Sequence, residues 1–175
     1  MPNSQTHDII TLVSAAGADI AYLYLSPHPS AQSAGMFTLT YLFAGYACAG
    51  DLDLDSREYR RWGLLRFIWW PYRAMVPHRS WVSHGLLLGG AIRVLYLGAA
   101  STLLFWLTLW LYSRLGPHVN ATMATQEGWK LLATWARLYP HLSIAAVCGF
   151  ILAGTSHSLA DIVYSRIKRS RRLFH

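Results

Sequence analysis

The sequence predicts an all-α fold: a polytopic membrane protein with four transmembrane helices and one segment that lies along the membrane surface. Three observations predict it. Hydrophobic residues make up 54% of the 175 residues and charged residues only 13%, about half the charged share of an ordinary globular domain. Four apolar stretches approach or exceed the length needed to span a bilayer. The basic residues gather beside these stretches, as they do in membrane proteins.

The four predicted spans cover about residues 9–25, 35–50, 85–112 and 130–158 of a single membrane domain, 1–175. Pro27 and Pro29 separate the first two spans, since two prolines so close together prevent a continuous helix. The third span is almost wholly apolar. Pro140 interrupts the fourth, which we interpret as one kinked helix.

The predicted surface segment covers about residues 64–76, between the second and third spans. Arg66 is mixed there with Phe67, Trp69 and Trp70, and the stretch is too short to cross a bilayer. A basic amphipathic segment of this kind is typical of the headgroup layer.

The distribution of charge predicts the orientation in the membrane. Six arginines lie between residues 51 and 83, and five basic residues lie in the tail at 164–175. The positive-inside rule places both regions, together with both termini, on the cytoplasmic side of the inner membrane. The net charge of +7 does not indicate a nucleic-acid partner, because the basic residues flank apolar stretches. Membrane lipids are the expected partners.

Histidine and aspartate residues cluster where the apolar stretches begin or end. With four spans, every cluster falls on the cytoplasmic side, although the clusters are spread over most of the chain. Each has an ordinary explanation when taken alone: His157 and Asp161, four apart on one helix face, can simply pair, and an aspartate pair can be a solvated loop. Together they predict a metal site with candidate ligands His7, Asp51, Asp53, His78, His84, His157 and Asp161.

Nitrogen and carboxylate donors without thiolate favour zinc, with manganese or iron as alternatives. Seven candidates would suffice for two metal ions with a bridging aspartate. The other histidines fall on the far side, inside the fourth span or at the frayed end, and are not expected to be ligands: His28, His118, His141 and His175.

The ordered motifs resemble those of the membrane-bound metal-dependent hydrolases of bacterial inner membranes. They are more similar still to a related family of predicted metal-binding membrane proteins without an assigned function. The likeness covers nearly the whole chain and rests on these motifs: Thr6-His7-Asp8, Asp51-Leu52-Asp53, His78-Arg79 to Ser83-His84, Ser156-His157 to Asp161, Arg61-Trp62-Gly63 and Trp70-Pro71-Tyr72. The resemblance implies metal binding.

Two functions follow as alternatives. The first is a metal-dependent hydrolase acting on a phosphoester or lipid-like substrate at the cytoplasmic face, with Asp53 or Asp161 as proton acceptor and Arg79 stabilising negative charge. The second is a non-catalytic, metal-binding membrane scaffold. A transporter is disfavoured because the ionisable residues gather at one face. Within the spans, Asp19 and Arg93 lie at matching depth and are expected to form an ion pair.

Overall fold

The structure, a computed structural model, describes residues 4–48, 50–76, 85–116 and 119–173, and every regular element in these ranges is a helix. The prediction of an all-α fold is therefore confirmed for the described residues. The long helices are α1 (Ser4–Leu25), α2 (Ala31–Ala47), α6 (Leu88–Leu115), α7 (Ala121–Leu138) and α8 (Pro140–Leu173). Shorter helices join α2 to α6: η1 (Gly50–Asp53), α3 (Arg57–Arg61), η2 (Gly63–Trp69) and α4 (Trp70–Met75).

Three helices in the described residues are long and apolar enough to cross a membrane, where the sequence predicted four. They are Ser4–Leu25, Leu88–Leu115 and Pro140–Ser170. The predicted span 35–50 forms α2, which has 17 residues. At a rise of 1.5 Å per residue, α2 is roughly 25 Å long, less than the ~30 Å of a hydrocarbon core.

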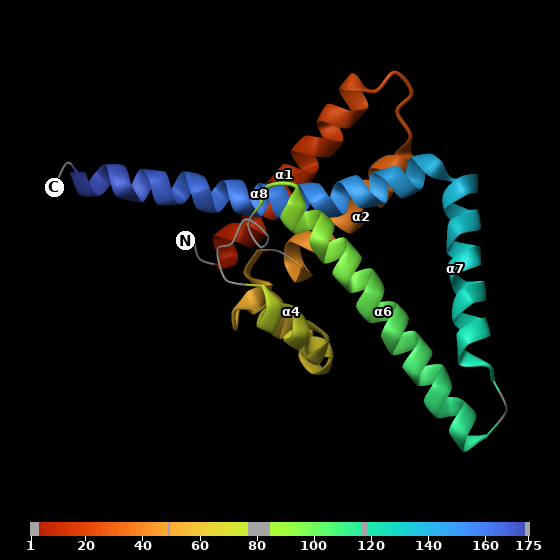
Figure 1. The fold of residues 1–175 in the computed structure, drawn as a ribbon. Coiled ribbons are helices and arrows are strands. Elements are labelled where there is room, and N and C mark those ends of the chain that lie inside the picture. The colour runs from red at the N-terminus through yellow and green to blue at the C-terminus, as the bar shows by residue number, and fades with distance from the viewer. Residues whose placement is uncertain (1–3, 49, 77–84, 117–118, 174–175) are drawn as a thin grey trace.

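The region predicted as one kinked span around Pro140 is two separate helices. α7 ends at Leu138, Tyr139 leaves the helical conformation (φ −126°, ψ 60°), and α8 begins at Pro140. Proline disfavours a helical residue before it and has no N–H to donate, yet suits a helix start. α7 consequently turns away from α8 (Figure 1), and its own start is capped by Asn120, which accepts a hydrogen bond from Met123 N at 3.0 Å.

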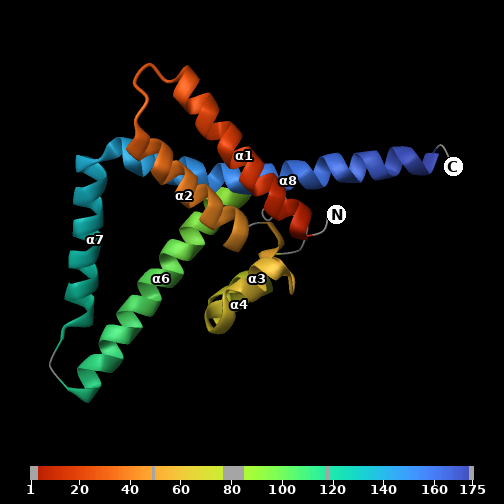
Figure 2. The same ribbon diagram turned by 180° about the vertical axis from the view of Figure 1, so that it is seen from behind.

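Helices α1 and α2 form an antiparallel pair that lies against α8 (Figure 2). Polar side chains connect the pair: Thr38 donates a hydrogen bond to Asp19, and Tyr41 donates one to Ser14 at 2.8 Å. These contacts place the start of α1 beside the end of α2.

Helix α8 packs more extensively against α2 than against any other element. The two backbones approach closely at Gly149, where an added Cβ would lie 2.5 Å from the carbonyl oxygen of Phe37. Small residues permit such approaches between apolar helices. From this contact onward, α2 and α8 run in the same direction, which carries the middle of α8 towards η1.

The segment between α2 and α6 packs through aromatic rings. Trp69 is fully buried and stacks on Tyr96 of α6 at 5.4 Å between ring centroids, with Tyr72 edge-on at 5.7 Å. Leu64 and Trp70 of the same segment are exposed. Of the predicted segment 64–76, residues 64–75 are thus helical, with one buried and one exposed apolar side. Their position at a membrane surface stays a prediction.

Candidate metal centre

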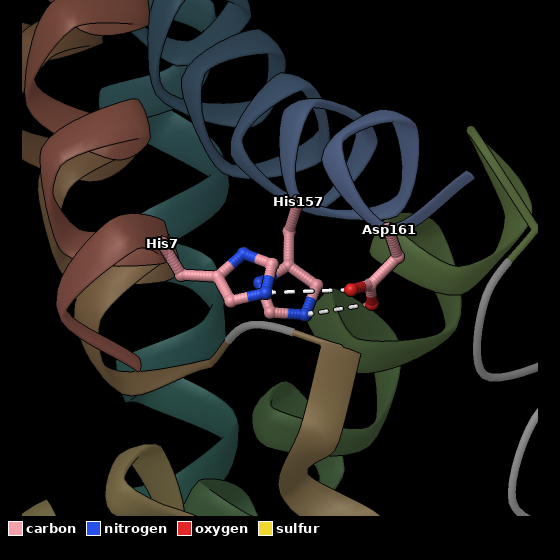
Figure 3. Close-up of side chains that lie close together, drawn as sticks. All are labelled: His7, His157 and Asp161. Carbon is pink, nitrogen blue, oxygen red and sulfur yellow. Dashed lines mark ion pairs between the residues drawn. The ribbon is translucent and has the colours of Figure 1, made fainter. Parts of the chain in front are cut away.

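Three of the predicted ligands meet where the start of α1 crosses the middle of α8. His7 lies in the first turn of α1, and His157 and Asp161 occupy adjacent turns on one face of α8. The side chains point toward one another from the two helices (Figure 3). The antiparallel pairing of α1 with α2, and the parallel packing of α2 on α8, bring these distant parts of the chain together.

The donor atoms are close enough to share one ion. His7 Nε2 lies 3.4 Å from Asp161 Oδ1, and His157 Nε2 lies 3.6 Å from Asp161 Oδ2. The two imidazole rings stack with their centroids 4.0 Å apart. One donor atom from each residue lies within 4.8 Å of the others, so the arrangement offers two nitrogens and a carboxylate to a single cation.

Burial distinguishes this group from an ordinary surface cluster. The exposed fractions of His7, His157 and Asp161 are 5%, 3% and 7%. Among the described residues, three imidazole nitrogens lack a hydrogen-bond partner: Nδ1 and Nε2 of His7, and Nε2 of His157. Buried polar atoms are nearly always hydrogen-bonded, because leaving one unpaired costs about 1–3 kcal/mol. Unpaired imidazole nitrogens facing a buried carboxylate therefore fit a bound cation.

Asp51 lies at the edge of the group. Its Oδ2 is 3.8 Å from His157 Nε2, and its side chain is 17% exposed. The short helix η1 positions it directly after α2. Asp51 thus lies near the three central residues, with access to solvent that they lack.

The structure does not show where the side chains of the other predicted site residues lie. His78, Arg79 and His84 lie outside the described residues, and Asp53 belongs to η1 with a side chain that is not described. Their assignment as ligands or catalytic residues stays a prediction.

The predicted ion pair between Asp19 and Arg93 is wrong. Asp19 instead accepts a hydrogen bond from Thr38 of α2. Arg93 is 1% exposed, and its Nη1 donates to the carbonyl oxygen of Cys48 at 3.2 Å. It also lies beside Gly154 of α8, one turn before His157. Arg93 therefore holds the junction of α2, α6 and α8 next to the centre.

A second charged contact, which sequence reasoning missed, fixes the first turn of α1. Asp8 lies 2.6 Å from Arg61 Nη2 and 3.6 Å from Arg57 Nη1. The hydrogen bond with Asp8 is the main reason that the pKa of Arg61 is raised. Arg61 also donates to Tyr46 O at 2.8 Å. This contact joins α1, α2 and α3, and so positions the neighbouring His7. The sequence does show Asp8 directly after the predicted ligand His7, and this acidic residue was the available sign of such a contact.

Comparisons with known proteins agree with a metal centre and supply no link to the hydrolases. A stretch of 62 residues, 35% of this chain, is 34% identical to an uncharacterized protein of Aquifex aeolicus (strain VF5) and covers 43% of that protein. The chain thus aligns with less than half the length of this relative. No solved structure matches. The sequence model of a family described as "Uncharacterized metal-binding protein (DUF2227)" matches residues 2–171, nearly the whole chain, and the chain belongs to this family.

Proposed function

We propose that this protein binds a divalent metal through His7, His157 and Asp161, and that zinc is the preferred ion. The observation that carries the proposal is the convergence of two buried imidazoles on one buried carboxylate, with ring nitrogens that lack hydrogen-bond partners among the described residues. Two nitrogens and a carboxylate oxygen are the donor set of many zinc sites, and manganese and iron accept the same donors.

The centre is proposed to serve a hydrolase that acts on a phosphoester or lipid-like substrate at the cytoplasmic membrane face. Three protein ligands are the usual number in catalytic zinc sites, which keep a further position for water or substrate. A divalent cation in such a site lowers the pKa of water to about 7 and polarises the bond to be cleaved.

The protein's own groups would then position the reactants. Asp51 Oδ2, 3.8 Å from His157 Nε2, is the nearby carboxylate with solvent access and is proposed to accept the proton of the attacking water. Asp161 is proposed to complete the ligand set with the two imidazoles. The predicted roles of Asp53 and Arg79 belong to the same proposal.

The membrane location rests on composition. Three apolar helices are long enough to span. Helix α2 returns the chain antiparallel to α1, so the basic residues of 51–83, with those of the tail, would lie on the cytoplasmic side. The metal centre, formed by the start of α1 and the middle of α8 beside the segment after α2, would lie on that side as well.

A second function, a non-catalytic metal scaffold, is favoured by the burial of the centre. His7, His157 and Asp161 are all at most 7% exposed, as expected when a metal joins helices rather than receives a substrate. In this alternative the ion contributes mainly to folding free energy.

One experiment separates the two functions. The detergent-purified protein is stripped with chelator, reloaded with zinc, manganese or iron, and assayed on p-nitrophenyl phosphate and phosphatidic acid. The hydrolase predicts metal-dependent turnover, and Asp51→Asn should keep its metal but lose about 100-fold or more in rate, as for loss of a general base. Metal-loaded protein without turnover, together with a large fall in unfolding temperature on chelation, would instead establish the scaffold.

A further inference from the structure

A second candidate site lies away from the metal centre, between the η2–α4 segment and helix α6. It is an apolar groove of about 390 Å³, within the range of small-molecule sites. Phe67 and Pro71 form one wall, and Ala100 and Leu104 of α6 form the other. Tyr96 also lines it, but its hydroxyl donates to the carbonyl oxygen of Ile68, so this polar group already has a partner.

A recess with a positive charge adjoins the groove. It measures about 740 Å³ and is lined by Gly63, Leu64, Arg66, Phe67 and Trp70. Phe67 lines both spaces, so the apolar groove and the recess adjoin at this residue. Arg66 is exposed, and its guanidinium is thus available to an anion next to an apolar cavity.

The surroundings of the groove are apolar. Leu64 is 94% exposed and Trp70 is 62% exposed. Helix α6 is one of the three that are long enough to span a membrane, and none of its most apolar 18-residue window is buried inside the protein. An amphiphile lying along α6 would cover these side chains and the groove together.

We propose that this groove binds one phospholipid with an anionic headgroup, its acyl chain against Ala100 and Leu104 and its phosphate at Arg66. Guanidinium groups pair well with phosphate, and a headgroup of net negative charge is further attracted to this arginine-rich segment. An acyl chain satisfies the apolar walls without leaving polar atoms unpaired. A second copy of this chain fits less well, because it would bring a net charge of +7 towards the same arginine-rich segment. The lipid is a bound constituent, and its site does not depend on the metal centre.

The proposal predicts lipid retention that a bulky residue in the groove abolishes. Full-length protein is purified in mild detergent from membranes that contain anionic and neutral phospholipids, and its bound lipid is measured by native mass spectrometry and lipid extraction. Wild type should retain about one phospholipid, enriched in anionic headgroups. Ala100→Trp fills the groove and should reduce retention at least 10-fold. The matched control is Leu95→Trp, at an exposed α6 position outside the groove, which should retain lipid as wild type does.

Arg66→Gln keeps the test decisive if Ala100→Trp does not fold, because Arg66 is exposed and its replacement leaves the apolar packing intact. It should remove the preference for anionic over neutral phospholipid. Wild-type protein that carries only detergent or neutral lipid would overturn the proposal. So would equal retention by folded Ala100→Trp and Leu95→Trp, or an unchanged headgroup preference in Arg66→Gln.

Discussion

His157→Ala is expected to reduce the metal affinity of the purified protein by more than about 100-fold. His157 offers Nε2 to the centre from a position that is 3% exposed, and alanine supplies no donor atom to replace it. Loss of a group that only supports a ligand already costs about 10–100-fold, and loss of a ligand should cost more. The measurement is metal per protein by elemental analysis after dialysis against a weak chelator.

The matched control for this variant is His141→Ala. His141 lies on the same helix, α8, but is exposed and far along it from the centre, so its loss should leave the metal content unchanged. Asp161→Asn should behave like His157→Ala, since the carboxylate charge is removed while the side-chain volume stays the same. Full metal content in His157→Ala would show that the ion is bound elsewhere in the chain.

Gly149→Ala is expected to destabilise the protein by about 1–3 kcal/mol or more, as overpacking does. The added Cβ would lie 2.5 Å from the carbonyl oxygen of Phe37. A backbone atom cannot rotate away as a side chain can, so α2 and α8 must separate. Because this contact also sets the position of η1 relative to His157, metal affinity should fall together with the unfolding temperature followed by tryptophan fluorescence.

The control for Gly149→Ala is Gly98→Ala on α6. Among the described residues, no atom apart from the neighbouring backbone of α6 itself lies within 4 Å of the Cβ that this substitution adds. Alanine is favoured over glycine in a helix by about 0.5–1 kcal/mol. This variant should be as stable as wild type or more so. An unfolding temperature for Gly149→Ala equal to that of wild type would refute the close α2–α8 contact.

The meeting of His7 with His157 and Asp161 could be predicted from sequence because it depends on coarse features. Apolar helices separated by proline-rich or polar turns must reverse direction. The start of one helix then lies on the same side of the bundle as the end of the next. The spacing of four between His157 and Asp161 places both on one helix face without tertiary information. Residue chemistry and chain reversal were sufficient for this part of the site.

Helix ends and long side-chain contacts could not be predicted in the same way. The Asp19–Arg93 pair was expected from matching depth alone, but depth does not determine which helices face each other. Arg93 instead reaches the carbonyl of Cys48, one of the groups that a helix end leaves unpaired and that carries the negative end of the helix dipole. Arg93 thus binds the backbone carbonyl at the end of α2 and does not pair with the carboxylate of Asp19.

The length of α2 and the break at Pro140 show a related effect. Hydropathy predicts where apolar residues lie but not where hydrogen bonding stops. Tyr139, forced out of the helix by the proline after it, ends α7 within a continuous apolar stretch. A sequence window across 130–158 averages over this break and predicts one helix.

X-ray absorption spectroscopy of the purified, metal-loaded protein tests the central claim most directly, because it reports the atoms bound to the ion. We expect two imidazole nitrogens and carboxylate oxygen at about 2.0–2.2 Å around zinc, and one imidazole fewer in any His157→Ala protein that is reloaded at high metal concentration. Sulfur at about 2.3 Å, which only cysteine or methionine could supply, or an ion without imidazole ligands would contradict a centre built from His7, His157 and Asp161.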